Sequence, residues 1–546
     1  MLDAAERVGH KHLLPGFDLL SHVERHDPGA AAEALAYPFV GSWAARCLRL
    51  LTEAEASTDG VTTDLSHLSG IAAVAAIRAR VPFSIEVPVR DGAVYLPSLG
   101  RLIAPGGAAV TLHSDGHEPM AARRPVMGSP NWQPVHQIRL VREGQSLSIA
   151  LDDIDPFRGG PRLPVAPRLS DAAVQAWARS LGQAWTILVR HHADYASGIA
   201  AGLAAIVPMV TLPNRGVNAT DSESFGATAI SAVSDAVALA VGLLHEFQHC
   251  KLNAVLHLAK LLKPDDGHYY AAWRQDPRPL SGLLHGAYAY VGVCDFWRVQ
   301  AGLPDTPHPG HAQMEFARWS DSTSRVLAVL LGSGSLTQTG ERFVLGMRDR
   351  LRTGSAARMP TEPVQLARLA SADHRISWRL RNAWPRAEAV DALVRAWRAG
   401  LPAPEAAAQA TPDVRDGGVA FGASSRLDLI YLRLREPARL AVMTRRDDVN
   451  PADADLINGN RTQAAVGYLD QIEPNDIDAW TGLALALGET LPALLHSPEL
   501  VRALYARLLE MSGQAPDLGQ LASWLNPAVP VDPVQLSDPE SPSPSR

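Results

Sequence analysis

Residues 231–252 read SAVSDAVALAVGLLHEFQHCKL. This stretch predicts a helix that carries two histidines, and the rest of the fold must hold that helix in place. Ser234 or Asp235 can cap a helix there, and the apolar run that follows supplies its buried face. His245 and His249 lie about one turn apart on one face, so both imidazoles can reach one cation. The alternative is a core helix with one buried and one solvated histidine. The metal site is favoured because two histidines in an apolar helix need partners.

Glu246 follows the first histidine and is rotated by about 100° from it around the helix axis. It therefore points beside a metal ion held by His245 and His249 rather than at it. In zinc peptidases this placement suits a general base that acts on the metal-bound water. The chain does not continue as HExxHxxGxxH, which excludes the zincins with a third histidine on that pattern.

A second helix is predicted in DPRPLSGLLHGAYAYVGVCDFW (276–297), beginning after Pro279. Asp295 lies about 15 Å along this helix from His285, so at most one of them binds the same ion. His285 is the expected third ligand because it is near the helix start and Tyr288 falls on its face one turn on. The alternatives are a histidine that bonds a backbone carbonyl between packed helices, and an Asp295 that only pairs with a nearby arginine.

Two arginines come just before this helix, in WRQDPRPL (273–280). Arg274 and Arg278, in a segment stiffened by proline, can hold a carboxylate bidentately. In the alternative reading, they pair with Asp276 and Asp265 in an ordinary loop. The sequence supports both readings equally.

The composition excludes several classes of function. The net charge is -7 and no run of Lys or Arg is present, so a nucleic-acid partner is not expected. The three cysteines are far apart, without a CxxC pair, which argues against a thiolate zinc site. The longest apolar stretch, residues 199–213, contains Pro208 and is too short to span a bilayer. We therefore expect a cytoplasmic protein with no membrane association.

The apolar periodicity predicts an α+β fold that is mainly α. Helices are expected first, and then a small antiparallel sheet at roughly 80–155. A hairpin is expected around Asp91-Gly92, and the same pattern is repeated around a turn at Glu143-Gly144. The sequence predicts an N-terminal helical and sheet region (1–165) followed by a helical metal-binding domain (166–400). A linker (401–418), a C-terminal helical region (419–530) and a disordered tail (531–546) are expected to follow.

The C-terminal region contains one helical hairpin by prediction. Residues 460–489 are expected to form two helices around Pro474-Asn475-Asp476, which resembles a single tetratricopeptide-type unit. The segment LDDIDPFRGGP (151–161) is expected to leave the sheet, and its aspartates either contact the site or form a solvated acidic loop.

Two long segments resemble the 2-oxoglutarate-dependent HExxH-type peptide β-hydroxylases, which modify ribosomally made peptides. These segments are SESFGATAISAVSDAVALAVGLLHEFQHCKL (222–252) and YYAAWRQDPRPLSGLLHGAYAYVGVCDFW (269–297). Weaker similarity is found in VPVRDGAVYLPSLG (87–100), LDDIDPFR (151–158) and DAWTGLALAL (478–487). No radical-SAM cysteine motif is present, so the chain resembles a stand-alone member of the family.

The resemblance implies a mononuclear non-haem Fe(II) enzyme. Such an enzyme uses 2-oxoglutarate and O2 to hydroxylate the β-carbon of a residue in a precursor peptide. The resemblance implies His245, His249 and His285 as the ligands of the iron. It also implies Arg278 as the clamp for the distal carboxylate of 2-oxoglutarate, with Arg274 as the second choice.

The same resemblance implies further pocket residues. Ser222 and Ser224 are expected to line the co-substrate pocket, together with Tyr288. Glu246 would accept a hydrogen bond from a ligand or hold a water. Because iron oxygenases usually use two histidines and one carboxylate, Glu246 or Asp295 is the alternative third ligand.

Two other functions stay open at this point. One is an HExxH zinc metallopeptidase with Glu246 as general base, and the other is a non-catalytic peptide-binding scaffold that uses the C-terminal hairpin. The lack of a downstream NExxSD glutamate counts against a thermolysin-like plan, and the paired arginines count for a small dicarboxylate. The expected partner is a precursor peptide, recognised by strand pairing at the N-terminal sheet. No oligomeric state follows from the sequence.

Overall fold

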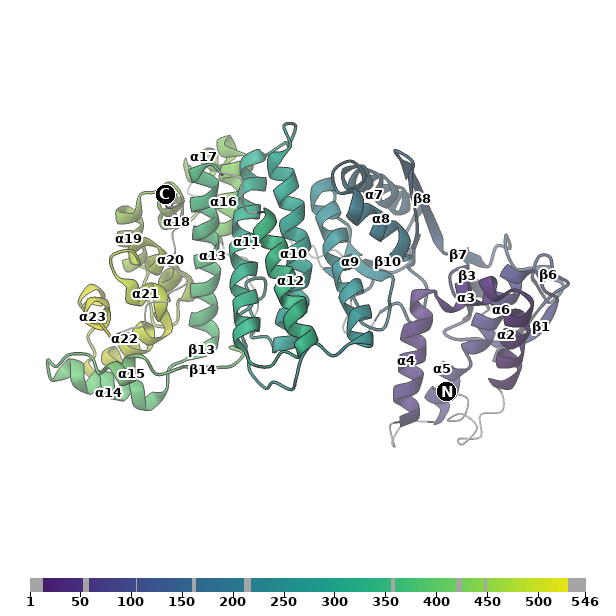
Figure 1. Cartoon of the computed structure of the whole chain (residues 1–546), viewed down its shortest axis with the longest axis horizontal. Helices are drawn as coiled ribbons and strands as arrows, with labels where there is room; N and C mark the ends of the chain where they lie inside the picture. Colours follow the sequence, from purple (N-terminus) through teal and green to yellow (C-terminus); the bar gives the residue numbers. More distant parts are fainter. Residues whose placement is uncertain are drawn as a thin grey trace, which may run out of the picture. The chain divides into compact units, whose positions relative to one another are not determined.

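The computed structural model describes residues 13–52, 58–104, 106–159, 164–210, 218–354, 359–418, 425–445 and 449–528. The protein is mainly helical (59%) with small antiparallel and mixed sheets, which confirms the predicted α+β, mainly α class (Figure 1). It forms two compact units, Met1–Leu258 and Ala259–Arg546. The boundary between the units falls inside the segment 166–400, which the sequence analysis treats as one domain. The tail predicted at 531–546 lies outside the described residues.

The first unit begins with helices, as the sequence predicts. They are α2 (Leu14–His26), α3 (Pro28–Leu35), α4 (Pro38–Thr52), α5 (Thr58–Leu65) and α6 (Leu68–Ala79). The carboxylate of Asp27 caps α3 by accepting a hydrogen bond from the backbone N–H of Ala30 at 3.0 Å. Helix α6 is almost entirely buried because it packs against α2, α3 and β1 (Phe83–Pro88).

The predicted sheet region contains two small antiparallel sheets and part of a third sheet. The first two have the strand orders β1-β4-β5-β6 and β2-β3-β7. Their further strands are β2 (Ala93–Leu96), β3 (Gly100–Ile103), β4 (Ala109–Ser114), β5 (Met120–Ala121), β6 (Arg124–Pro125) and β7 (Trp132–Pro134).

The two predicted turns have different outcomes. The turn at Glu143-Gly144 joins β8 (His136–Arg142) to β9 (Gln145–Leu151) in an antiparallel hairpin, as predicted. Asp91 and Gly92 also form a tight turn, with φ of 51° and 74°. The hairpin expected around them is wrong, however, because β1 pairs with β4 and β2 pairs with β3. Only one bridge, between Arg90 and Ala93, closes that turn.

The third sheet is mixed and contains parallel strands that the sequence analysis missed. Its order is β11-β12-β10-β9-β8, in which β10 (Ala205–Met209) runs parallel to β9 and to β12 (Ala227–Ser231). The remaining strand is β11 (Asn218–Ala219). Strands β10 and β12 are short and buried at every position, so they lack the alternation that identifies a half-exposed strand.

Helices cover both faces of this mixed sheet. Ala205, Val207 and Met209 pack in one core cluster with residues of α4. The other helices of this part, α7 (Asp171–His191), α8 (Ala193–Gly202) and α9 (Ala236–Leu258), contact β8, β9 and β12. Helix α9 therefore has a rigid support, and it begins shortly after a buried strand.

The aspartates that follow β9 are buried rather than solvated, which corrects one of the two alternatives for this segment. Asp152, Asp153 and Asp155 are at most 3% exposed. Asp152 accepts hydrogen bonds from the hydroxyl of Tyr37 and from the backbone of Ile154 and Asp155. These carboxyl groups therefore stabilise the end of the strand.

The second unit begins with long helices that lie side by side (Figure 1). They are α10 (Leu280–Gly302), α11 (Pro309–Gly332), α12 (Gln338–Gly354) and α13 (Thr361–Asn382). Arg426, 2% exposed, joins α13 to the next helices through ion pairs with Asp373 and Asp453. A buried arginine needs this complete pairing, because an uncompensated buried charge destabilises strongly.

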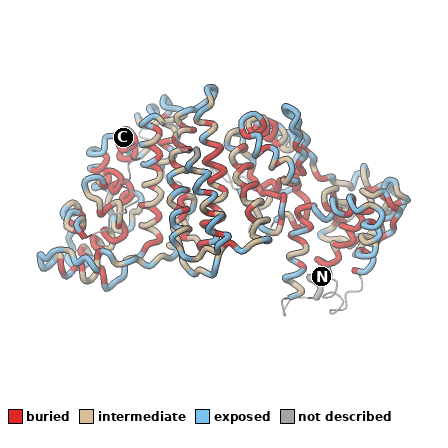
Figure 2. The backbone as a smooth tube through the Cα atoms, in the orientation of Figure 1, coloured by how far each residue is buried: buried red, intermediate tan, exposed pale blue. Residues whose placement is uncertain are grey.

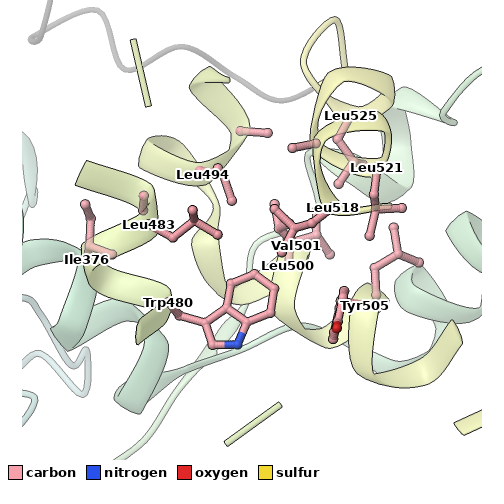
Figure 3. Packing of buried hydrophobic residues seen from close by; sticks show 14 of the residues in the cluster. Ile376, Trp480, Leu483, Leu494, Leu500, Val501, Tyr505, Leu518, Leu521 and Leu525 are labelled. Atoms are coloured by element: carbon pink, nitrogen blue, oxygen red, sulfur yellow. The ribbon is translucent and has the colours of Figure 1, made fainter. Parts of the chain in front are cut away.

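The remaining helices surround the C-terminal core. They are α14 (Ala387–Arg398), α15 (Glu405–Ala408), α16 (Ser425–Arg435), α17 (Pro437–Arg445), α18 (Pro451–Ile457), α19 (Arg461–Leu469), α20 (Ile477–Leu487), α21 (Pro492–His496), α22 (Pro498–Ser512) and α23 (Leu518–Leu525). Many of them bury one side and expose the other (Figure 2). Figure 3 shows Trp480, Leu483 and Val501 meeting in this core.

Two predictions concern this part of the chain. The helical hairpin is confirmed, because α19 and α20 pack together on either side of Pro474-Asn475-Asp476. The segment expected to be a linker, 401–418, contains α15 and β14 (Asp413–Val414), which pairs with β13 (Ala383–Trp384). It is held in place because Ala408 is buried in the C-terminal core. Among the described residues, no helix is long and apolar enough to cross a membrane.

Replacement of Asp155 by asparagine should make stability less dependent on pH. Burial, together with the charge of Asp152, raises the pKa of Asp155 above that of an unfolded carboxyl group. The folded state therefore holds the proton more tightly, and the contribution of Asp155 to stability falls as the pH rises above about 4. The amide oxygen of the introduced asparagine can still accept the hydrogen bond from the backbone of Phe157. Between about pH 5 and about pH 8, the melting temperature of Asp155→Asn should fall less than that of wild type. Exposed Asp18→Asn is the control, and an equal effect of both variants would contradict the prediction.

Candidate metal centre

The two motif histidines share one face of α9. The carboxylate of Asp235, one of the two expected caps, accepts hydrogen bonds from the backbone of Val237 and Ala238 at 2.8 and 3.1 Å. The Nε2 atoms of His245 and His249 are 3.1 Å apart. Two nitrogens that bind one ion at about 2.0–2.1 Å, with an octahedral or tetrahedral angle, lie about 2.8–3.4 Å apart. The pair therefore fits a shared metal ion, and without a metal it fits a hydrogen bond between neutral rings.

The environment of His245 keeps its ring neutral. Burial lowers the pKa of His245 to about 4. A metal ion binds the neutral form of imidazole, so no proton has to be displaced from this ring near pH 7. The helix therefore presents a ligand that is ready to bind.

Glu246 lies beside the histidine pair and is only 3% exposed. Its Oε2 accepts a hydrogen bond of 2.7 Å from the hydroxyl of Thr220, and its Oε1 is 3.9 Å from Nε2 of His245. Burial raises the pKa of Glu246 to about 7, and the Thr220 hydrogen bond opposes that rise. The carboxyl group can thus hold or release a proton near neutral pH.

Thr220 is a site residue that the sequence analysis missed. It follows β11 and lies 26 residues before Glu246, so no helical or strand spacing connects the two. The mixed sheet brings them together, because β11 pairs with β12 and α9 contacts both strands. A hydroxyl residue in a loop gives no signal of its own in the sequence.

The two serines expected to line the pocket lie in a loop that contacts α4. Ser222 is exposed. Ser224 is buried, and its hydroxyl forms a hydrogen bond with the hydroxyl of Ser42 on α4. Glu223, between them, pairs with Arg49 on the same helix. This loop is therefore anchored to α4.

One further buried polar group close to the histidines lacks a hydrogen-bond partner. Gln248 precedes His249 and is 4% exposed, and its side-chain oxygen has no hydrogen-bond partner. An unsatisfied buried acceptor costs about 1–3 kcal/mol. Native proteins retain such groups rarely, and often where a water, an ion or a ligand completes them.

The other predicted site residues belong to the second unit. His285 lies on α10, and burial, together with the charge of Arg278, lowers its pKa. A Cβ atom at Gly282 would lie 3.0 Å from Nε of Arg278, so this side chain runs along the first turns of α10. Tyr288 stacks on Phe343 of α12, with ring centroids 5.4 Å apart.

The arginine pair has the partner that the alternative reading named. Arg274 and Arg278 both bind Asp276, at 2.8 and 3.1 Å. Asp265 instead accepts hydrogen bonds from Tyr269 and Ser335. Two guanidinium groups and one carboxylate leave one net positive charge in the segment before α10.

Asp295 has partners that compete with a metal ion. It is 8% exposed, and its carboxylate accepts a hydrogen bond of 2.8 Å from Arg350. Arg298 is 3.8 Å from the other oxygen. Within either unit, the described residues include no group of three or more His, Cys, Asp or Glu side chains arranged to hold a metal. The first unit thus offers two candidate ligands, His245 and His249, and a metal site would need a further one.

Loss of the Thr220 hydroxyl should destabilise the protein by about 1–3 kcal/mol, because a buried carboxyl group would lose its partner. Thr220→Val keeps the shape but removes the donor, whereas Thr220→Ser keeps the donor and removes the methyl group. Urea unfolding of both variants measures the difference. A larger loss for Thr220→Ser than for Thr220→Val would show that packing, and not the hydrogen bond to Glu246, determines stability here.

Comparison of the sequence with models of protein families gives no match. Comparison with curated proteins also gives no match.

Proposed function

We propose that this protein is an Fe(II)- and 2-oxoglutarate-dependent dioxygenase that hydroxylates the β-carbon of a residue in a ribosomally synthesised precursor peptide. One observation carries the proposal: two half-buried imidazoles with Nε2 atoms 3.1 Å apart lie on one face of α9, with a buried carboxyl group beside them. The resemblance of residues 222–252 and 269–297 to the peptide hydroxylases selects this chemistry among the metal reactions that such a pair allows.

His245 and His249 would bind the iron, with His285 as the third ligand. When bound, Fe(II) with 2-oxoglutarate and O2 supplies the oxidising power for hydroxylation of a C–H bond. Three neutral ligands leave the positive charge of the ion uncompensated, which favours a dianionic co-substrate. Neutral rings are needed for this role, and the lowered pKa values of His245 and His285 support it.

Arg278 would bind the distal carboxylate of 2-oxoglutarate. The net positive charge of Arg274, Asp276 and Arg278 attracts an anion. Asp276 orients the two guanidinium groups, and Arg278 has the position next to the helix of His285. Glu246, held through Thr220, would orient a ligand or a water by a hydrogen bond.

The precursor peptide would bind as an added strand. β8 is the terminal strand in the order of the mixed sheet, so its outer edge can pair with an extended peptide. Residues of β8 are largely exposed or half-buried. In this binding mode, hydrogen bonds to the peptide backbone supply affinity, and contacts with the peptide side chains determine which peptide binds.

A zinc metallopeptidase is the second candidate, and one observation favours it. The pKa of Glu246, about 7, suits a general base that acts on a metal-bound water. Such an enzyme needs the carboxylate for its reaction, whereas the proposed hydroxylase needs it only for orientation.

Anaerobic addition of Fe(II) and then 2-oxoglutarate to metal-free protein should produce a visible charge-transfer band. His245→Ala should abolish the band because the ligand pair is lost. His257→Ala is the matched control, since His257 is exposed on the same helix. Glu246→Gln should keep the band in a hydroxylase, and it should abolish hydrolysis in a peptidase. Absence of the band together with tight zinc binding would reject the hydroxylase.

Arg278→Ala should weaken 2-oxoglutarate binding by about 10- to 100-fold, because a charge-assisted hydrogen bond contributes about 1.5–3 kcal/mol. The affinity for Fe(II) alone should change little. Arg274→Ala, which removes the neighbouring charge, is the comparison. Titration of the charge-transfer band with 2-oxoglutarate gives the dissociation constant of 2-oxoglutarate for each variant. An equal or larger loss in Arg274→Ala would assign the clamp to Arg274 instead.

A further inference from the structure

Three oxidisable aromatic side chains in the second unit form a continuous series that starts beside His285. The indole of Trp273 lies against the backbone of Gly286, where a Cβ atom would be only 2.1 Å from its Cζ2. Trp273 stacks on Tyr290, with ring centroids 4.7 Å apart and planes inclined by 14°. Tyr290 in turn contacts Trp319 on α11, with centroids 4.4 Å apart.

The far end of this series has a built-in proton acceptor. Nε1 of Trp319 donates a hydrogen bond of 2.6 Å to Oε2 of Glu315, which is 5% exposed. The other oxygen of Glu315 accepts a hydrogen bond from Tyr431 at 2.9 Å. The guanidinium of Arg318 lies over the Trp319 ring, 4.4 Å from its centroid. This cation disfavours a positively charged indole, so oxidation of Trp319 favours loss of its proton to the adjacent carboxylate.

We infer that Trp273, Tyr290 and Trp319 form a path for one-electron oxidation, which carries an oxidising equivalent from the His285 end of α10 to Trp319. Indole and phenol are readily oxidised side chains, and rings in contact exchange electrons easily. The source of the oxidant rests on the proposed function: O2 activation without a peptide in place leaves a strong one-electron oxidant near the metal ligands. The path would protect those ligands from damage.

The path moves one electron and one proton in total. The oxidant takes one electron from Trp273 and is reduced. One electron then passes from Trp319 through Tyr290 to Trp273; Tyr290 is oxidised only in passing and keeps its phenolic proton, so Trp273 and Tyr290 return to their original state. Trp319 loses one electron, and its Nε1 proton passes to Glu315, which leaves a neutral indolyl radical. A thiolate then returns one electron and becomes a thiyl radical, while the proton returns from Glu315 to Nε1.

The path can be tested without iron, 2-oxoglutarate or peptide. The native cysteines Cys47, Cys250 and Cys294 are buried, so a cysteine introduced by Arg274→Cys at a half-exposed side chain can be labelled selectively with a ruthenium photo-oxidant. After flash oxidation in aerated buffer, oxygenated tryptophan is located by peptide mass spectrometry. In the labelled full-length chain, the product should be found at Trp319.

Tyr290→Phe in the labelled chain keeps the stacked ring but removes the oxidisable phenol. The product should then move from Trp319 to Trp273. Tyr505→Phe, in the C-terminal core, is the matched control and should leave the product at Trp319. Product that stays at Trp273 in the parent, or that reaches Trp319 equally in Tyr290→Phe, would overturn the path. Because the photo-oxidant replaces the metal, these results are independent of the charge-transfer titration that tests the proposed function.

Discussion

Removal of the Glu246 carboxyl group and of most of the neighbouring His245 ring from water is the constraint on which the candidate site depends. A buried charge is costly, so His245 is held neutral and the pKa of Glu246 is raised. This cost falls on the buried middle part of α9, which contacts strands of the mixed sheet. Any metal that binds the pair therefore meets prepared ligands rather than solvated side chains.

The same principle applies to two buried charges of the second unit, Arg426 and Glu315, which both have several polar partners. Arg426 has two carboxylates, and Glu315 has Arg318, Trp319 and Tyr431 around it. Near the start of α10, in contrast, two arginines share one aspartate and remain half-exposed. This incomplete neutralisation leaves a positive charge that can attract an anion, whereas the interior pairs stabilise the fold.

The aromatic series on α10 and α11 shows how a core can combine stability with chemistry. Trp273 fills the space that the absent side chain of Gly286 leaves, so a bulkier residue at 286 would displace the indole. The ring contacts from Trp273 to Tyr290 and from Tyr290 to Trp319 contribute to core packing whether or not they carry electrons. What distinguishes the series is its end, where an indole N–H donates directly to a buried carboxylate.

The sequence by itself determined the features that depend on neighbouring residues. The class of fold, the helix that carries His245 and His249, the hairpin at Glu143-Gly144 and the helical pair at 461–487 all follow from local periodicity and turn chemistry. Only the tertiary structure decided the contacts between residues distant in the chain: the parallel strands β10 and β12, the hydrogen bond from Thr220 to Glu246, and the anchoring of Ser224 on α4. The reason is physical. A fully buried strand has no exposed face to give a period, and a hydroxyl group has no preferred partner until the fold supplies one.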